Sequence, residues 1–127
     1  IIEQDNNDAY ALNYLSYSMA VRNEELDKAE FFIKRALKLK PNNGFFLDTL
    51  GWVKYKQKKY DEAIQNLQRA ISIEPVNAEI MDHLGDAYLK TKRFKEALFE
   101  WNRAIKYEKD KLKIKSIVEK IKALNDD

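Results

Sequence analysis

Cysteine is absent from the 127-residue sequence, which excludes disulfides, thiolate metal sites and cysteine nucleophiles. Glycine occurs three times and proline twice, a scarcity that suits long helices joined by tight connections. No apolar run approaches the roughly 20 residues needed to span a bilayer. We therefore expect a soluble, helix-rich chain without a membrane segment or a membrane partner.

The sequence also lacks a strong charge of one sign. Its net charge is +2, with 45% hydrophobic and 35% charged residues, which is typical of a folded domain. Two lysine-rich clusters, at residues 54–59 and 90–95, lie near expected helix C-termini, where the helix dipole favours cations. The balance therefore predicts no nucleic-acid partner.

The first residues show no targeting signal. Ile1-Ile2-Glu3-Gln4-Asp5 has neither an initiator methionine nor the basic start and apolar core of a signal peptide. We expect a piece of a longer protein. The cytoplasm is the favoured compartment, and the periplasm fits if the parent protein carries a signal.

A period of 34 residues organises the chain. The stretch from Leu47 to Pro75 reads LDTLGWVKYKQKKYDEAIQNLQRAISIEP, a pair of amphipathic helices joined by a short turn. Residues 34 apart repeat its small and helix-ending positions: Gly51 and Gly85; Ala29, Ala63 and Ala97; Ala36, Ala70 and Ala104; Pro41 and Pro75. A fixed spacing of this size predicts an array of stacked helix pairs.

Apolar periodicity and capping residues predict the helices individually. We expect helices at about 9–21, 26–39, 44–57, 60–73, 78–91, 94–107 and 112–125. Asp8 and Asn43 are expected N-caps, and one extra residue falls in the first turn near Asn23–Glu25. Lys109 stands where earlier pairs have proline, which predicts a weak break before the last helix.

Two glycines lie within expected helices. Gly51 and Gly85 each cost about 1 kcal/mol relative to alanine. That cost indicates a close approach of the partner helix at facing small residues. Ser16 replaces glycine in the first pair, which predicts looser packing there.

The repeated segments resemble the tetratricopeptide repeat (TPR) family. The resemblance rests on LGWVKYKQKKYDEAIQNLQRAISIEP and LGDAYLKTKRFKEALFEWNRAI. The segments LNYLSYSMA, LDTLGWVKY and MDHLGDAYL are similar to segments of multi-repeat bacterial TPR proteins. The family resemblance implies an all-α fold, a right-handed α-solenoid of three helix-turn-helix units at 9–43, 44–77 and 78–111. Residues 1–8 then form the tail of a preceding repeat and an N-cap, and residues 112–127 a C-terminal capping helix.

The resemblance implies a scaffold for protein–protein interaction rather than an enzyme. A partner segment would lie in a concave groove lined by Asn13, Tyr17, Asp48, Thr49, Trp52, Lys56, Asp82, His83, Asp86 and Lys90. Carboxylates beside aromatic rings favour a basic or basic–aromatic protein or peptide partner. Two alternatives remain open. These positions are ordinary solvated side chains, or the chain is a structural spacer or self-assembly module of a larger protein.

Several site types are not expected. The family's clamp for acidic chaperone-type C-terminal tails needs lysine, asparagine and arginine where this chain has Asn13, Tyr17, Thr49, Glu79 and His83. We therefore predict no specific binding of such tails. The lone histidine lacks partners for a metal site, and no cofactor motif is present.

The last expected helix, 112–125, is amphipathic. Its apolar face carries Ile114, Ile117, Val118, Ile121 and Leu124, opposite a lysine-rich face. We interpret it as a cap over the end of the array, with a basic helix for a membrane or a partner as the alternative. At the other end, Leu12, Leu15 and Phe32 lack a neighbour, which predicts self-association of this fragment.

Overall fold

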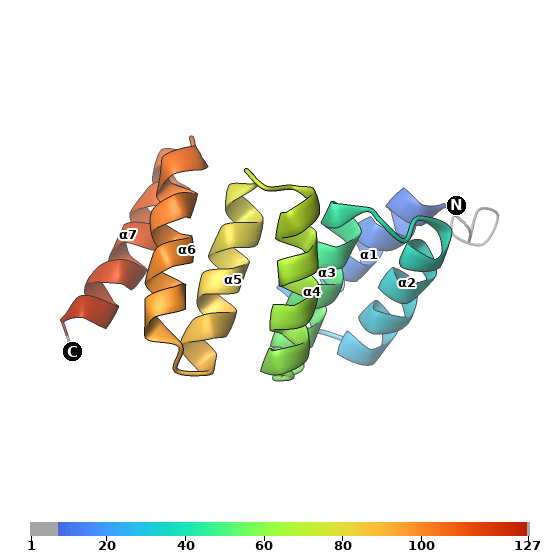
Figure 1. Cartoon of the computed structure of the whole chain (residues 1–127). Coiled ribbons are helices and arrows are strands. Elements are labelled where there is room, and N and C mark those ends of the chain that lie inside the picture. The colour runs from blue at the N-terminus through green and yellow to red at the C-terminus, as the bar shows by residue number, and fades with distance from the viewer. Residues whose placement is uncertain (1–7, 127) are drawn as a thin grey trace. The chain divides into compact units, whose positions relative to one another are not determined.

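The computed structural model describes residues 8–126, which form seven α-helices and no strand (Figure 1). The helices are α1 (Ala9–Val21), α2 (Leu26–Leu39), α3 (Gly44–Lys56), α4 (Tyr60–Ile73), α5 (Ala78–Lys90), α6 (Phe94–Tyr107) and α7 (Lys111–Asn125). Each bound lies within one residue of its prediction, so the helical assignment is confirmed. Two compact units divide at Glu74 and Pro75, with α1–α4 in unit 1 and α5–α7 in unit 2.

Side-chain caps begin the first helix of each pair. The Asp8 carboxylate accepts hydrogen bonds from the backbone N–H groups of Tyr10 and Ala11 at 3.0 and 3.2 Å, as predicted. Asn43 caps α3 in the same way, with N–H donors at 2.9 and 3.1 Å. Asn77 accepts from the N–H of Ile80 at 3.0 Å at the start of α5. These bonds satisfy backbone donors that a helix start leaves unpaired.

The break before α7 is sharper than the missing proline predicts. Asp110 caps α7, accepting from the N–H groups of Leu112 and Lys113 at 2.9 and 3.2 Å. The Glu108 carboxylate accepts from the N–H groups of Lys109 and Asp110, each at 3.1 Å. Two acidic side chains therefore replace proline in separating α6 from α7.

Left-handed residues close the turn within each pair. Asn23, Lys58 and Lys92 have φ of 56°, 66° and 64°, each directly after the last helical turn. At Lys58 the N–H donates to the carbonyl of Tyr55, and the next N–H donates to that of Lys54, which is a Schellman motif. The first turn adds a second such residue, Glu25 at φ 49°, and thus absorbs the predicted extra residue.

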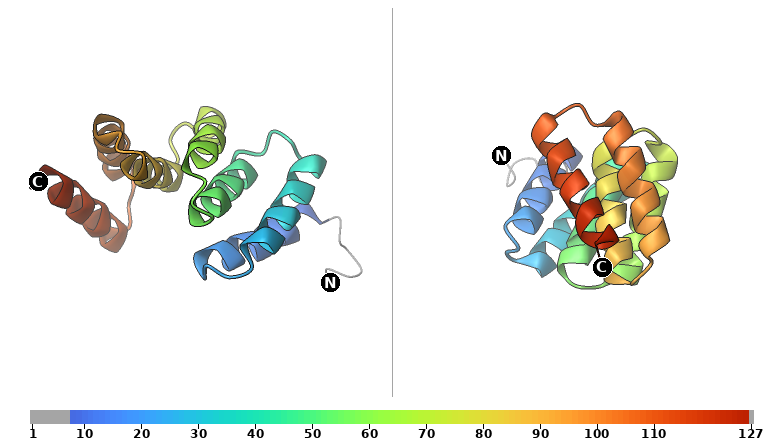
Figure 2. Two further views of the ribbon diagram at one scale, coloured as in Figure 1. Left: turned by 90° about the horizontal axis from the view of Figure 1, so that it is seen from below. Right: turned by 90° about the vertical axis from the view of Figure 1, so that its left-hand side faces the viewer.

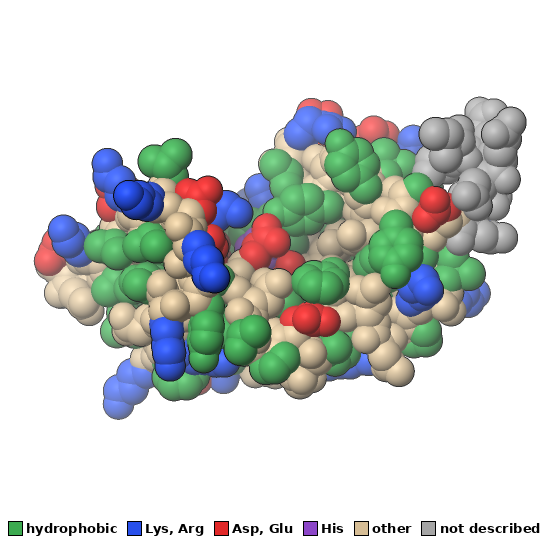
Figure 3. All heavy atoms as spheres, turned by 90° about the horizontal axis from the view of Figure 1, so that it is seen from above, with side chains coloured by type: hydrophobic (Ala, Val, Ile, Leu, Met, Phe, Trp, Pro, Cys, Tyr) green, Lys and Arg blue, Asp and Glu red, His purple; other side chains and the backbone are tan. Residues whose placement is uncertain are grey.

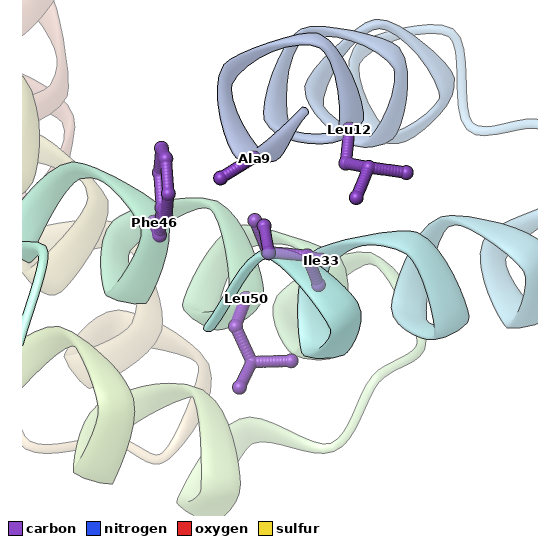
Figure 4. Packing of buried hydrophobic residues seen from close by; sticks show 6 residues of the cluster. Ala9, Leu12, Ile33, Phe46 and Leu50 are labelled. Atoms are coloured by element: carbon purple, nitrogen blue, oxygen red, sulfur yellow. The ribbon is translucent and has the colours of Figure 1, made fainter. Parts of the chain in front are cut away.

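The core of unit 1 joins α1, α2 and α3. Ala9 and Leu12 of α1 pack with Ile33 of α2 and with Phe46 and Leu50 of α3 (Figure 4). A second cluster lies nearer the other end of α1 and is formed by Met19, Ala20, Ala29 and Val53. Helices α1 and α3, the first helices of the two pairs in unit 1, therefore pack side by side.

Three small residues, Ser16, Gly51 and Gly85, each face the second helix of their own helix pair. A Cβ on Gly51 would lie 2.7 Å from Cγ of Leu67, and a Cβ on Gly85 would overlap the indole of Trp101. The glycines thus make room for large side chains, and the backbone carbonyl of Ala63, a predicted facing alanine, also lies 3.3 Å from the Cβ position of Gly51. Ser16 donates a buried hydrogen bond of 2.7 Å to the carbonyl of Ala29. The looser packing predicted for the first pair stays a prediction.

Unit 2 places α7 beside α6 (Figure 2). Trp101 of α6 is fully buried against α5. Within α7, Ile117 is the buried side chain, whereas Leu112 is 78% exposed. The last helix is therefore attached through one shallow apolar contact zone.

Candidate interaction surfaces

A line of aromatic side chains runs along one face of α1 and α3. On α3, Phe45 lies three residues before Asp48, and Trp52 and Tyr55 lie four and seven residues after it, which places them on one side of the helix. Tyr10, Asn13 and Tyr17 occupy the matching positions of α1, 35 residues earlier. We call the following six residues the aromatic face: Tyr10, Asn13, Tyr17, Phe45, Trp52 and Tyr55.

The aromatic rings of this face are accessible, and two of them, those of Tyr10 and Trp52, contact lysine ammonium groups of the same chain. Tyr10 and Phe45 are 62% and 49% exposed, and the other four are partly exposed. Trp52 stacks on Tyr55 with ring centres 4.5 Å apart and planes 5° apart. The ammonium groups of Lys56 and Lys40 lie 5.7 and 5.6 Å from the ring centres of Trp52 and Tyr10. These distances are typical of cation–π contacts.

Two predicted groove residues of α3 are buried. Asp48 is 5% exposed and is engaged by other groups of the protein. Thr49 is 3% exposed and donates its hydroxyl to the carbonyl of Phe45 at 3.2 Å. Their side chains offer little surface to a partner, so the accessible part of this face is aromatic more than acidic.

Two acidic residues of α5, Asp82 and Asp86, are bonded to α7. The ammonium of Lys120 donates to the carboxylates of Asp82 and Asp86, both at 2.9 Å. It also lies 5.9 Å from the ring centre of Trp101. His83 is 6% exposed, while Lys90 stays exposed at the end of the helix. The predicted acidic pair therefore exists as a pair, but it is bound to a lysine of the same chain.

Burial and charge shape the titration of this cluster. Burial raises the pKa of Asp86, and neighbouring Asp82 adds to the rise, which the charge of Lys120 offsets only in part. For Lys120, burial lowers the pKa, but the two carboxylates outweigh burial and raise it. The carboxylates of Asp82 and Asp86 thus share the single ammonium of Lys120 between α5 and α7, where little water reaches them.

Lys54 does not belong to a solvated basic cluster. It is 6% exposed, and its ammonium lies 3.1 Å from carboxylate oxygens of both Glu30 and Glu62. Burial opposes ionisation of Glu30, but hydrogen bonds from Lys34, Gln57 and Lys54 lower its pKa to about 2. Lys54 therefore ties α3 to α2 and α4 instead of serving a polyanion.

Over residues 8–126, the structure contains no group of three or more His, Cys, Asp or Glu side chains placed to hold a metal ion. No helix in that range is long and apolar enough to cross a membrane. Figure 3 shows hydrophobic side chains exposed in patches, with lysine, arginine and acidic residues between them.

The structure groups the predicted site residues into two sets. Asn13, Tyr17 and Trp52 lie on the aromatic face of unit 1, with Lys56 on the Trp52 ring. Asp82 and Asp86 lie with Lys120 in unit 2. Sequence reasoning missed Tyr10, Phe45, Tyr55 and Lys120. The spacing around Asn13 and Asp48 points to the first three, but nothing distinguishes Lys120 from its neighbouring lysines.

Known proteins match this chain in sequence. The family model described as tetratricopeptide repeat matches residues 18–43 and 78–111, and the one described as TPR repeat matches residues 51–92. A TPR repeat-containing protein of Pseudomonas aeruginosa is 36% identical over 63 residues, which cover 50% of this chain and 11% of that protein. The match thus spans about a tenth of the length of this bacterial relative.

Solved structures share the fold. The first TPR of Spaghetti (RPAP3), bound to the HSP90 peptide SRMEEVD, has a TM-score of 0.83 at 14% identity, covering 96% of this chain and 94% of that one. The N-terminal domain of stress-induced protein-1 from C. elegans has a TM-score of 0.71 at 22% identity, covering 92% and 94%. MamA has a TM-score of 0.75 at 22% identity, covering 98% and 74%.

The matched segments, the paired helices and the fold of these neighbours agree on an all-α helical repeat of the solenoid class. The chain belongs to the tetratricopeptide repeat family.

Proposed function

We propose that this chain is a protein-interaction module that binds a segment of a partner protein on the first helices of the two pairs in unit 1, α1 and α3. The observation that carries the proposal is the aromatic face, where large rings stay accessible on packed helices. Partly exposed tyrosine and tryptophan side chains supply most of the binding energy in many interfaces, because they bury much area at a small cost in side-chain entropy. Rigid helices hold these rings in place.

The chemistry of the face favours a basic or basic–aromatic segment. Lys56 and Lys40 already seat their ammonium groups on Trp52 and Tyr10. A lysine or arginine of a partner would replace or join them on the same rings. The buried carboxylate of Asp48 adds negative potential beneath the face.

Acidic chaperone-type tails remain an unfavoured ligand, although one neighbour of the same fold is bound to such a peptide. Thr49 and His83, at two positions of the clamp, are buried, and Glu79 at a third carries negative charge. None of these side chains supplies a cation for a terminal carboxylate. We therefore expect SRMEEVD not to bind at micromolar concentration or below.

The test compares three forms of the chain in capture from a native lysate. Trp52→Ala removes the centre of the aromatic face, and Tyr14→Ala removes a 75% exposed tyrosine of α1 outside it. We expect wild type and Tyr14→Ala to retain a partner that Trp52→Ala loses, with unchanged circular dichroism. A segment of that partner is then titrated by calorimetry. Equal retention by all three forms would place binding on another face and refute the proposal.

A structural spacer or self-assembly module is the second candidate. It is favoured by exposed apolar side chains outside the aromatic face, such as Tyr14 and Val21 at 75% and 52% exposed. Under this alternative, Trp52→Ala leaves the set of captured proteins unchanged. Changes at Tyr14 and Val21 then alter only the assembly state.

A further inference from the structure

Helix α7 occupies the place of a further first helix. Lys120 lies 34 residues after Asp86, which itself lies 34 residues after Trp52. Each earlier first helix packs against a second helix of its own pair. No second helix follows α7 in the part of the chain that the structure describes. Helix α7 packs beside α6 and bonds to α5 through Lys120.

The attachment of α7 is local and shallow. Of its apolar residues only Ile117 is buried, and Ile114, Val118, Ile121 and Leu124 are half-buried. The polar part of the contact is the single ammonium of Lys120 on Asp82 and Asp86. Elements with few buried contacts open at a small fraction of the global unfolding free energy.

The surface beneath α7 has the chemistry of a binding site. It offers two partly buried carboxylates four residues apart on α5. It also offers Leu89 of α5, which lines a hollow together with Lys120, Ala123 and Leu124 of α7 itself. An amphipathic helix satisfies all of these features when it carries an apolar residue, a lysine three residues later and a leucine four residues after that. Ile117, Lys120 and Leu124 form this pattern in α7.

We propose that α7 is a displaceable occupant of the acidic face of α5, and that a lysine-bearing amphipathic helix of a partner protein takes its place. Charge complementarity selects the partner, because a covering helix without a cation would leave the carboxylates of Asp82 and Asp86 buried and unpaired, which is costly. The partner's apolar residues cover the surface of α6 that α7 leaves. This inference concerns unit 2 and does not depend on the aromatic face of unit 1.

The test uses the full chain and a fluorescein-labelled peptide with the sequence of residues 111–125, in fluorescence polarisation. Lys120→Gln weakens the internal helix and leaves its site intact. Lys115→Gln removes an exposed lysine of α7 and is the matched control. We expect Lys120→Gln to bind the peptide about tenfold more tightly than wild type and Lys115→Gln do, because the open site is populated more often. A peptide with glutamine in place of the lysine that corresponds to Lys120 should bind at least about tenfold more weakly.

A cross-link provides an independent measurement. The chain has no cysteine of its own, so Leu89→Cys with Ala123→Cys can be joined by a short thiol-reactive linker across one hollow. The linked protein should lose peptide binding, and the same protein with its cysteines capped singly should keep it. Two results would each overturn the proposal: Lys120→Gln binding no tighter than wild type, or linked and capped proteins binding equally. Loss of a captured partner by Trp52→Ala tests only the proposed function of the aromatic face and not the displacement of α7.

Discussion

Lys54 is an ammonium placed between two carboxylates at the junction of three helices. Its side chain is 7% exposed, and those of Glu30 and Glu62 are 18% and 55% exposed. Such a cation contributes little while all partners are present, since its desolvation offsets much of its attraction. Its removal, however, leaves Glu30 without a buried counter-charge.

We expect Lys54→Ala to lower the free energy of unfolding by about 2 kcal/mol, because it strands a largely buried carboxylate. Urea unfolding followed by circular dichroism measures the change. Lys34→Ala is the control, since Lys34 also contacts Glu30 at 2.6 Å but is 58% exposed. The control should change stability by less than about 0.5 kcal/mol. Equal effects of the two variants would contradict this account.

The Glu30 carboxylate predicts that the free energy of unfolding falls at acidic pH. The pKa of Glu30 falls from 4.5 to about 2 on folding, so its contribution is fully present above pH 4.5. That contribution is lost as the pH falls through about 2. Thermal unfolding between pH 6 and pH 2 should therefore show a decline that Glu30→Gln makes shallower. An unchanged slope in Glu30→Gln would exclude Glu30 as the cause.

The backbone of Lys58 is strained in the turn between α3 and α4. Its φ of 66° is left-handed, in a motif where glycine is the preferred residue. We expect Lys58→Gly to raise the free energy of unfolding by about 1 kcal/mol, because glycine removes the Cβ conflict. Lys59→Gly, at φ −96°, should instead be neutral or destabilising. A lower unfolding midpoint for Lys58→Gly would show that the lysine side chain matters more than its backbone.

At the scale of elements, each pair uses a different contact at one repeated position. Ser16 bonds to the carbonyl of Ala29, Gly51 receives Leu67, and Gly85 receives Trp101. The close approach of two helices is thus common to the pairs. The volume and the polarity of the contact differ between them.

Gly85→Ala should destabilise unit 2 by about 2 kcal/mol or more, because the added methyl overlaps a fully buried indole. Trp101→Phe in the same chain should restore part of that loss, since the smaller ring leaves room for the methyl. A thermal double-mutant cycle measures the coupling between the two positions. Additive effects would mean that the two side chains do not share this space.

Most of the helical elements could be predicted from the sequence, because a 34-residue period fixes both their phase and their ends. Pro41, Asn43 and Asp8 mark boundaries through local chemistry alone. The break before α7 was underestimated, since it depends on two carboxylates bonded to backbone donors rather than on proline. The size of the residue facing Gly85 also needs the packed structure.

At the scale of the whole molecule, the candidate surfaces were predictable only where one helix carries them. Helical spacing places Asn13 and Tyr17 together, as it does Asp82 and Asp86. The pairing of that acidic couple with Lys120 depends on how a later helix packs on α5. Lysines recur throughout α7, so periodicity cannot single out one of them.

Exposed apolar side chains predict an assembly property. Leu12 is fully buried, and Leu15 and Phe32 are half-buried, so the exposed apolar side chains of the first pair are not the predicted ones. They include Tyr14 and Val21 of α1, at 75% and 52% exposed, and Phe31 of α2, at 57% exposed. We expect the isolated chain to self-associate, with a sedimentation coefficient that rises with concentration. Tyr14→Ser with Val21→Ser should weaken the dependence. A concentration-independent monomer would contradict the expectation.

The two tryptophans give each unit an optical reporter of its own. Trp52 in unit 1 is partly exposed and stacked on a tyrosine, whereas Trp101 in unit 2 is fully buried. Its indole nitrogen has no hydrogen-bond acceptor among residues 8–126. In a Trp52→Phe chain, emission should therefore arise at short wavelength and shift to longer wavelength whenever water reaches the ring. Because the ammonium of Lys120 lies over the ring of Trp101, departure of α7 should shift the fluorescence emission of Trp101 to longer wavelength, without any attached dye.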